Sequence, residues 1–341
     1  MSLSAPILMP LSSLYGVITR ARLSLYRKGA FRSFKLQRPV ISVGNITTGG
    51  TGKTPLVGWI AKRLAASGKR TCILTRGYGR RNPNSRVLVS DFDTVFASAA
   101  DAGDEPYMLA CQLEGIAAVI SDSDRFSAAI EATNHLNPDC FLLDDGFQHL
   151  RLARDLDIVT IDATNPWGGG KLLPAGRLRE NKAGLSRVDC VVVTRSDQAP
   201  DVTTLRSEIE QLTNNRSLFL SRMVPRGVHA LHNSPNMSLP LKNVAAFCAV
   251  GNPQSFYSHL ETTGCDVVLR RTFRDHHAYS QEDIDHLQIK AKQARAELLI
   301  TTAKDAVKIA GLSFSLPCYV LDFQIEIENE DRFFEVICTA I

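Results

Sequence analysis

The fold of this chain is decided by the stretch Pro39-Val40-Ile41-Ser42-Val43-Gly44-Asn45-Ile46-Thr47-Thr48-Gly49-Gly50-Thr51-Gly52-Lys53-Thr54-Pro55. Residues 39–43 are a short β-branched run typical of a buried strand, and a helical pattern follows over residues 55–67. A strand, a glycine-rich loop and a helix in this order are the setting of a phosphate-binding P-loop. Backbone N–H groups of such a loop converge on phosphate oxygens at the helix N-terminus. The sequence therefore predicts a nucleotide-binding site formed by Thr47, Thr48, Gly49, Gly50, Thr51, Gly52, Lys53 and Thr54.

Two side chains of this loop are expected to act directly on the cofactors, ATP and Mg²⁺. Lys53 would reach the β- and γ-phosphates, and the hydroxyl of Thr54 would bind the metal. The strict P-loop pattern has Gly at position 47, where this chain has Thr. Residues 49–54 instead resemble the loops of MinD/ParA ATPases, although Thr48 replaces the lysine that those proteins carry there. A MinD/ParA-like, membrane-associated switch ATPase is therefore the alternative to a metabolic kinase.

Paired carboxylates follow a second apolar run. Residues 140–143 are predicted to form a buried strand, and Asp144 and Asp145 come directly after it. Ligands bind at the carboxyl ends of parallel strands, so this pair is well placed to serve the metal. Adjacent residues of an extended chain point to opposite sides. One Asp is thus expected to face Mg²⁺ while the other holds water or caps the loop, and the sequence leaves open which does which.

Further polar residues have both a functional and a structural interpretation. Asp104 precedes a helical pattern, and it either caps that helix or serves as a base for an attacking hydroxyl. The Gly- and Pro-rich residues 162–180 are predicted to form a mobile loop that lines the site. In this loop Arg177 and Arg179 would hold phosphate, and Glu180 would reach the metal. The alternative is an ordinary solvated loop with one ion pair.

The length of 341 residues is sufficient for two domains. We expect an N-terminal segment at 1–36, a P-loop kinase domain at 37–228 and a smaller α/β domain at 229–341, with a linker in the breaker-rich residues 225–240. The fold class is α/β, a P-loop NTPase-like α/β/α sandwich with this second, smaller α/β domain. In that domain Asp275-His276-His277 follows a strand. A carboxylate beside two imidazoles orients a general base or binds phosphate, although most histidines are structural.

Charge is distributed unevenly along the chain. Residues 1–90 contain 16 of the 39 Lys and Arg and no Asp or Glu, so this part carries +16 and the remainder −12. Residues 7–31 combine apolar and basic side chains with helical spacing, which favours an amphipathic helix lying on an anionic membrane surface. A helix packed on the core, with a solvated basic edge, is the alternative. Nucleic acid is not an expected partner, because no recognition motif interleaves with the basic residues, and no obligate protein partner is evident.

The motifs taken together resemble the tetraacyldisaccharide 4′-kinases, the lipid A kinases of Gram-negative bacteria. The resemblance covers nearly the whole chain, and in one position it departs from the family, which usually has Glu where this chain has Ala303. It rests on Val43-Gly44-Asn45, Gly49-Gly50-Thr51-Gly52-Lys53-Thr54-Pro55, Thr75-Arg76-Gly77-Tyr78-Gly79, Gly103-Asp104-Glu105-Pro106, Asp144-Asp145-Gly146-Phe147-Gln148-His149, Pro174-Ala175-Gly176-Arg177-Leu178-Arg179-Glu180, Gly251-Asn252-Pro253, Phe273-Arg274-Asp275-His276-His277 and Thr301-Thr302-Ala303-Lys304-Asp305-Ala306.

This resemblance implies transfer of the ATP γ-phosphate to the 4′-hydroxyl of an acylated disaccharide 1-phosphate. It also implies peripheral attachment to the cytoplasmic face of the bacterial inner membrane through the N-terminal helix. By matching position, Asp104 and His276 resemble the pair that activates the sugar hydroxyl. Thr54, Asp145 and Glu180 would surround Mg²⁺, and Lys53 would steady the γ-phosphate.

Overall fold

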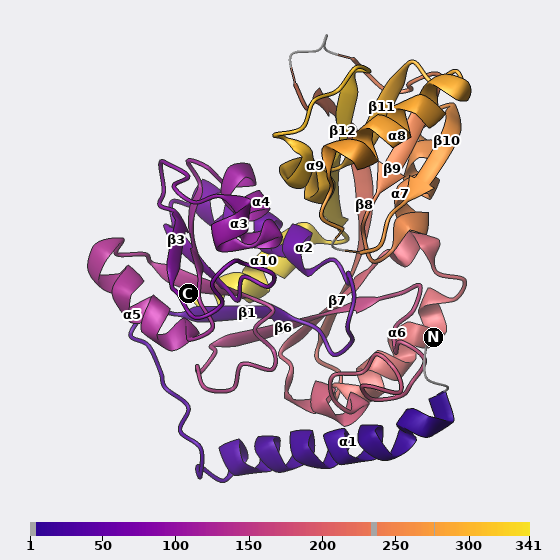
Figure 1. Ribbon diagram of the computed structural model, residues 1–341. Coiled ribbons are helices and arrows are strands. Elements are labelled where there is room, and N and C mark those ends of the chain that lie inside the picture. Colours follow the sequence, from indigo (N-terminus) through magenta and orange to yellow (C-terminus); the bar gives the residue numbers. More distant parts are fainter. Residues whose placement is uncertain (1–4, 233–236, 276) are drawn as a thin grey trace. The chain divides into compact units, whose positions relative to one another are not determined.

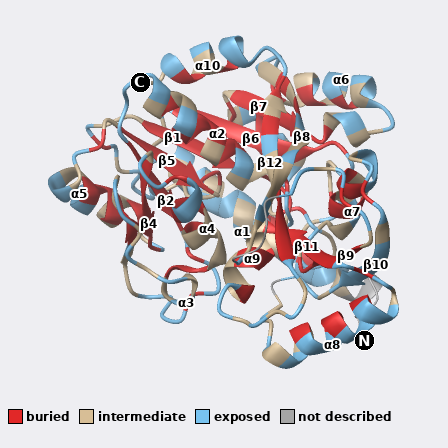
Figure 2. Cartoon of the chain, turned by 90° about the horizontal axis from the view of Figure 1, so that it is seen from above, coloured by how far each residue is buried: buried red, intermediate tan, exposed pale blue. Residues whose placement is uncertain are grey.

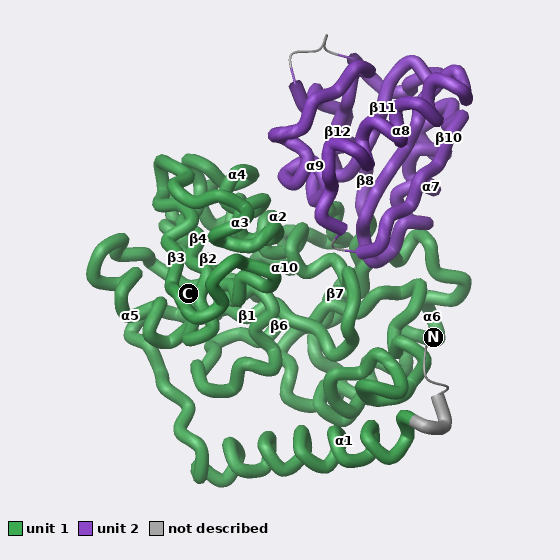
Figure 3. The backbone as a smooth tube through the Cα atoms, in the orientation of Figure 1, with its two compact units in different colours: residues 1–222, 325–341 green, residues 223–324 purple. Residues whose placement is uncertain are grey.

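A computed structural model describes residues 5–232, 237–275 and 277–341. The chain divides into two compact units, the first of Met1–Arg222 with Ile325–Ile341 and the second of Met223–Gln324 (Figure 3). The division expected from the sequence lies at 228/229 and assigns the whole C-terminal part to the smaller domain. The difference arises from two long strands, β8 (Ser217–Ala230) and β12 (Cys318–Ile327), each of which begins in one unit and ends in the other. Residues 225–230, expected to belong to a linker, therefore continue a strand.

The first unit is built on a sheet in which β1 (Val40–Gly44) pairs in parallel with β5 (Cys140–Asp144) on one side and with β6 (Leu156–Asp162) on the other. The strand order is β8-β7-β6-β1-β5-β2-β4-β3, and β3 at one edge is antiparallel to its neighbour (Figure 1). The other strands and the helices of this part are β2 (Thr71–Thr75), β3 (Val87–Ser90), β4 (Ala117–Ser121), β7 (Cys190–Thr194), α2 (Lys53–Ala66), α3 (Ala99–Ala102), α4 (Asp104–Gln112), α5 (Arg125–His135), α6 (Val202–Leu212) and the 3₁₀ turns Lys182–Arg187 and Ser196–Gln198.

The central strands are buried along their whole length (Figure 2). This explains why they are continuous apolar runs in the sequence, as is typical of parallel sheets covered on both faces. The C-terminal helix α10 (Glu330–Cys338) packs on the first unit, where Phe333 lies 5.4 Å from Trp59 and 5.0 Å from Phe219, ring centroid to ring centroid. This aromatic contact is the physical reason why the last residues return to the first unit.

The second unit contains a parallel sheet of order β10-β9-β11-β12, flanked by β8. Its helix α8 begins with a capping box, in which Ser280 and Asp283 each accept a hydrogen bond from the backbone N–H of the other. The elements are β9 (Val244–Cys248), α7 (Pro253–Thr262), β10 (Val267–Thr272), α8 (Gln281–Gln293), β11 (Leu298–Thr302) and α9 (Ala303–Ile309).

The N-terminal helix α1 (Ala5–Arg27) packs on the first unit through its small and polar side chains. Ser12 and Gly16 are buried, whereas Leu11, Leu14 and Ile18 are 55–57% exposed. Its amphipathic pattern is therefore reversed relative to that of an ordinary surface helix, whose apolar side faces the core. Among the described helices, none combines the length and apolar content required to cross a bilayer.

Gly77 is required where the loop after β2 meets the ends of α3 and β4. Its φ is +66°, and a Cβ there would lie 1.8 Å from Ser121 Oγ and 2.6 Å from the carbonyl oxygen of Ala102. Gly68 has a similar φ of +80° but no neighbouring atom within 4 Å.

Gly77→Ala is therefore expected to lower the free energy of unfolding by about 2–4 kcal/mol, because overpacking adds to backbone strain. Gly68→Ala, the matched control, should cost only about 1 kcal/mol of strain. Urea unfolding measures both changes, and equal losses for the two variants would contradict the close contact.

Candidate active site

The loop between β1 and α2 has the backbone conformation of a phosphate cradle. Gly49 and Gly52 have φ values of +118° and +80°, and Gly52 caps α2 without a side-chain hydrogen bond. The first N–H groups of α2 therefore have no side-chain cap and point toward an incoming anion. A Cβ on Gly52 would lie 3.0 Å from Thr194 Cγ2, so this turn has no room for a larger residue.

Neighbouring strands hold the cradle in place. Thr51 Oγ1 accepts a 2.8 Å hydrogen bond from Asn45 Nδ2 and lies 2.8 Å from Thr160 Oγ1. Thr194 Oγ1 donates to the carbonyl oxygen of Thr51 at 3.0 Å. Thr47, which departs from the strict pattern, is buried and forms an antiparallel bridge with Leu178. Thr47, at the position where the strict pattern has glycine, is thus held by a backbone bridge.

Arg195 belongs to the polar turn 194–197, a position that the sequence indicates for contact with the base of a nucleotide. It has a left-handed φ of +54°, forms a buried ion pair with Asp162, and donates from Nη2 to the carbonyl oxygen of Gly50 at 2.5 Å. The guanidinium of Arg195 thereby fixes the backbone of the P-loop at Gly50. The apolar strand followed by a polar turn indicates this position, but no pattern in the sequence indicates its contact with Gly50.

Lys53, Asp145 and Arg179 form a charged cluster at the start of α2. Lys53 Nζ lies 3.4 Å from Asp145 Oδ1, and Arg179 Nη1 donates to both Asp145 oxygens at 2.7 and 2.8 Å. Burial acts to raise the pKa of Asp145, but Lys53 and Arg179 outweigh it and hold the pKa below its usual value. Arg179, expected to hold phosphate, is thus engaged with a carboxylate.

Asp144 differs from its neighbour in both environment and charge state. It is 3% exposed, and its Oδ1 has no hydrogen-bond partner among the described residues. Burial raises the pKa of Asp144 to about 7, and Glu105 adds to the rise while Lys53 opposes it. The buried guanidinium of Arg125 also acts on Asp144 and Asp145, and the sequence did not indicate this residue.

Glu180 is buried, and both of its carboxylate oxygens have partners. Arg187 donates to Glu180 Oε2 at 2.6 Å and to Oε1 at 2.9 Å, and Gln148 Nε2 donates to Oε1 at 2.7 Å. Gln148 Oε1 in turn accepts from Arg179 at 3.2 Å. Glu180 is thereby joined to the Asp145 cluster through Gln148. Thr54, in the first turn of α2, is half-buried.

The acceptor-side residues lie in different units. In the first unit Asp104 is the first residue of α4, and the cap is Gly103, so Asp104 does not serve as the cap. In the second unit His276 lies outside the described residues. Its neighbour Asp275 forms a 3.6 Å ion pair with Lys304. The described residues contain no cluster of three or more His, Cys, Asp or Glu suited to bind a metal.

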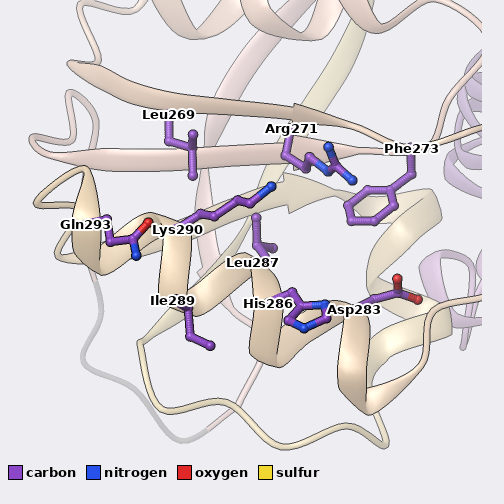
Figure 4. A pocket seen from close by; sticks show the side chains of 9 residues that line it. All are labelled: Leu269, Arg271, Phe273, Asp283, His286, Leu287, Ile289, Lys290 and Gln293. Atoms are coloured by element: carbon purple, nitrogen blue, oxygen red, sulfur yellow. The ribbon is translucent and has the colours of Figure 1, made fainter.

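A pocket of about 400 Å³ lies between β10 and α8, and Phe273 in its wall is two residues from Asp275 along the chain (Figure 4). Phe273 lines this pocket and stacks on His277 with 4.8 Å between ring centroids. Asp283, also in the wall, lies 3.0 Å from His277 Nε2 through its Oδ2. The wall thus anchors His277, the residue that follows the predicted catalytic histidine.

The raised pKa of Asp144 predicts that the stability of the folded chain depends on pH. Between its ordinary value near 3.8 and about 7, the folded chain holds a proton that the unfolded chain has lost. Stability of the wild type therefore falls as the pH rises through this range. Relative to wild type, Asp144→Asn should gain in Tm as the pH rises from about 4 to about 7 in metal-free buffer, as measured by thermal unfolding. A Tm difference that is independent of pH would contradict the assignment.

Comparison with known proteins shows which family this chain is similar to. A profile described as tetraacyldisaccharide-1-P 4′-kinase (LpxK) matches residues 4–341. The tetraacyldisaccharide 4′-kinase of Geobacter metallireducens is 43% identical over 303 residues, covering 89% of this chain and 88% of the relative. The enzyme of the same name from Halothermothrix orenii is 35% identical, with 97% and 91% covered.

A solved structure agrees with this assignment. The crystal structure of LpxK from Aquifex aeolicus in complex with ATP superposes with a TM-score of 0.80 at 30% identity, covering 98% of this chain and 99% of that one. The sequence, the P-loop geometry and these relatives lead to one conclusion: the chain belongs to the tetraacyldisaccharide 4′-kinases, the ATP-dependent phosphotransferases of lipid A biosynthesis.

Proposed function

We propose that this kinase binds ATP at the P-loop of its first unit, with Lys53 and the N–H groups at the start of α2 holding the β- and γ-phosphates. The observation that carries this proposal is the 3.4 Å contact of Lys53 Nζ with Asp145 Oδ1 at a glycine cradle whose helix has no side-chain cap. In phosphoryl transfer most of the catalysis comes from positioning and from neutralising charge. An ammonium and a row of backbone dipoles supply both.

The residues present fit a magnesium ion. Asp144 Oδ1 is buried without a partner among the described residues, Asp145 is held ionised, and Thr54 stands one residue after Lys53. Magnesium usually takes one or two carboxylates and completes its shell with phosphate oxygens and water, so a larger acidic cluster is not needed. When bound, Mg²⁺ neutralises charge on the phosphates. We propose that Thr54, Asp145 and Glu180 surround the ion, with Thr54 and Asp145 as its direct ligands. Glu180 lies farther out and is joined to Asp145 through Gln148 and Arg179.

The acceptor is proposed to be the 4′-hydroxyl of an acylated disaccharide 1-phosphate, activated by Asp104 and His276. A sugar hydroxyl is a weak nucleophile, so a base that accepts its proton speeds the attack. In support, Asp104 is the first residue of α4. Glu105, the next residue, acts electrostatically on Asp144, so the start of α4 lies close to the carboxylates that follow β5.

Transfer of γ-³²P from ATP to detergent-dispersed tetraacyldisaccharide 1-phosphate tests these roles. Lys53→Ala should lower kcat about 10²–10³-fold, because it removes charge that stabilises the transition state. Asp104→Asn should lower kcat about 10²–10⁴-fold without weakening ATP binding. The controls are Lys62→Ala, on the exposed side of α2, and Asp101→Asn, in α3. ATP hydrolysis without labelled lipid would contradict the proposal and favour a switch ATPase.

We further propose that α1 lies on the anionic cytoplasmic face of the bacterial inner membrane. Its outward side chains Leu11, Leu14, Val17 and Ile18 are 54–57% exposed. Four cations, Arg20, Arg22, Arg27 and Lys28, lie toward the end of the helix and just beyond it. Apolar side chains among acyl chains and cations on lipid phosphates are the usual interaction of an interfacial helix.

Leu14→Glu is expected to lower sedimentation with anionic vesicles about tenfold or more, because one large apolar side chain contributes about 1.5–3 kcal/mol when it leaves water. Ile130→Glu on α5, an exposed apolar position outside α1, is the matched control and should sediment as wild type does. Equal binding of Leu14→Glu and wild type would contradict the placement of α1 on the membrane.

A further inference from the structure

The segment Leu172–Glu180 lies against α1. Ser12 Oγ donates a 2.7 Å hydrogen bond to the carbonyl oxygen of Leu172, and the Tyr15 hydroxyl donates to that of Arg179 at 2.9 Å. Between these two contacts a Cβ on Gly16 would lie 2.7 Å from Leu172 Cδ1, so helix and segment are in close contact. Burial raises the pKa of the Tyr15 phenol above its usual value.

The same segment pairs with the P-loop. The N–H of Thr48 donates to the carbonyl oxygen of Arg177 at 2.7 Å, and the N–H of Arg179 donates to that of Ile46 at 2.8 Å. The carbonyl oxygen of Arg179 therefore accepts a hydrogen bond from α1, and that of Arg177 accepts one from the P-loop. The backbone of Arg179 is held between the helix and the first half of the cradle.

The side chain of Arg179 extends this connection to the reacting groups. Its guanidinium holds Asp145 through both carboxylate oxygens, and Asp145 contacts Lys53. Hence three direct contacts lead from the Tyr15 hydroxyl to the lysine of the P-loop. Among the described contacts, Tyr15 has no hydrogen bond with Lys53 or Asp145, so we expect its effect on transfer to pass through Arg179.

We propose that Tyr15 is a positioning residue for phosphoryl transfer, which it supports by fixing the backbone of Arg179 and thereby the Arg179–Asp145 pair beside Lys53. Ser12 assists at the other end of the segment. The helix that presents apolar side chains outward thus also sets the geometry of the P-loop. This inference rests on the proposed roles of Lys53 and Asp145.

Tyr15→Phe removes one hydroxyl and keeps the ring. We expect kcat for γ-³²P transfer to fall roughly three- to tenfold, because this is the loss expected when one such hydrogen bond is removed. KM values and sedimentation with anionic vesicles should stay within about twofold of wild type. Amide hydrogen exchange should become faster over residues 172–180. Tyr26→Phe is the matched control, because the Tyr26 hydroxyl makes no hydrogen bond within the described part of α1 or its surroundings.

A double-mutant cycle separates positioning from general destabilisation. If Tyr15 acts through Arg179, adding Tyr15→Phe to Arg179→Lys should cost much less in kcat than it costs in wild type. Unchanged kcat and exchange in Tyr15→Phe would overturn the proposal, as would additive losses in the cycle, or loss of vesicle binding together with kcat. Failure of wild type to label the lipid would instead overturn the proposed function, while the exchange measurement would still report the anchoring.

Discussion

The Asp145 carboxylate binds two cations at once, and the site depends on this arrangement. Lys53 approaches from the start of α2 and Arg179 from the segment that follows the Gly-rich loop. Because the two cations outweigh the effect of burial, Asp145 remains charged, whereas Asp144 beside it has a pKa raised to about 7. The pKa values of two adjacent carboxyl groups are thereby shifted in opposite directions.

The parallel sheet delivers these groups to one place. β1 ends at the glycine cradle, and β5, its neighbour in register, ends at Asp144. β6 and β7 add Asp162 and Thr194 at the equivalent ends, and both contribute to holding the cradle. Because side chains from four strand ends converge, no single loop has to define the site alone, in keeping with the general location of ligand sites in α/β folds.

Much of this arrangement was predictable from the sequence. The run before Gly44 and the run before Asp144 are apolar, short and followed by polar turns, and both are strands as expected. The contacts of Arg125 and Arg195 join residues that are distant along the chain, such as the bond from Arg195 to the carbonyl oxygen of Gly50. No local pattern encodes such a contact. The return of α10 to the first unit was likewise invisible, because it depends on Phe333 meeting rings that are far away in sequence.

The reversed amphipathic pattern of α1 has a consequence for its own attachment. A helix that packs through Ser12 and Gly16 buries little apolar area, so the hydrophobic effect contributes little to holding it on the unit. What remains is a small number of hydrogen bonds, each worth about 0.5–1.5 kcal/mol. In water α1 should therefore detach at a free energy well below that of global unfolding and be among the first segments that a protease cleaves. A surface that accepts its apolar side would suppress this opening, and the full local stability of the helix would be reached only in contact with that surface.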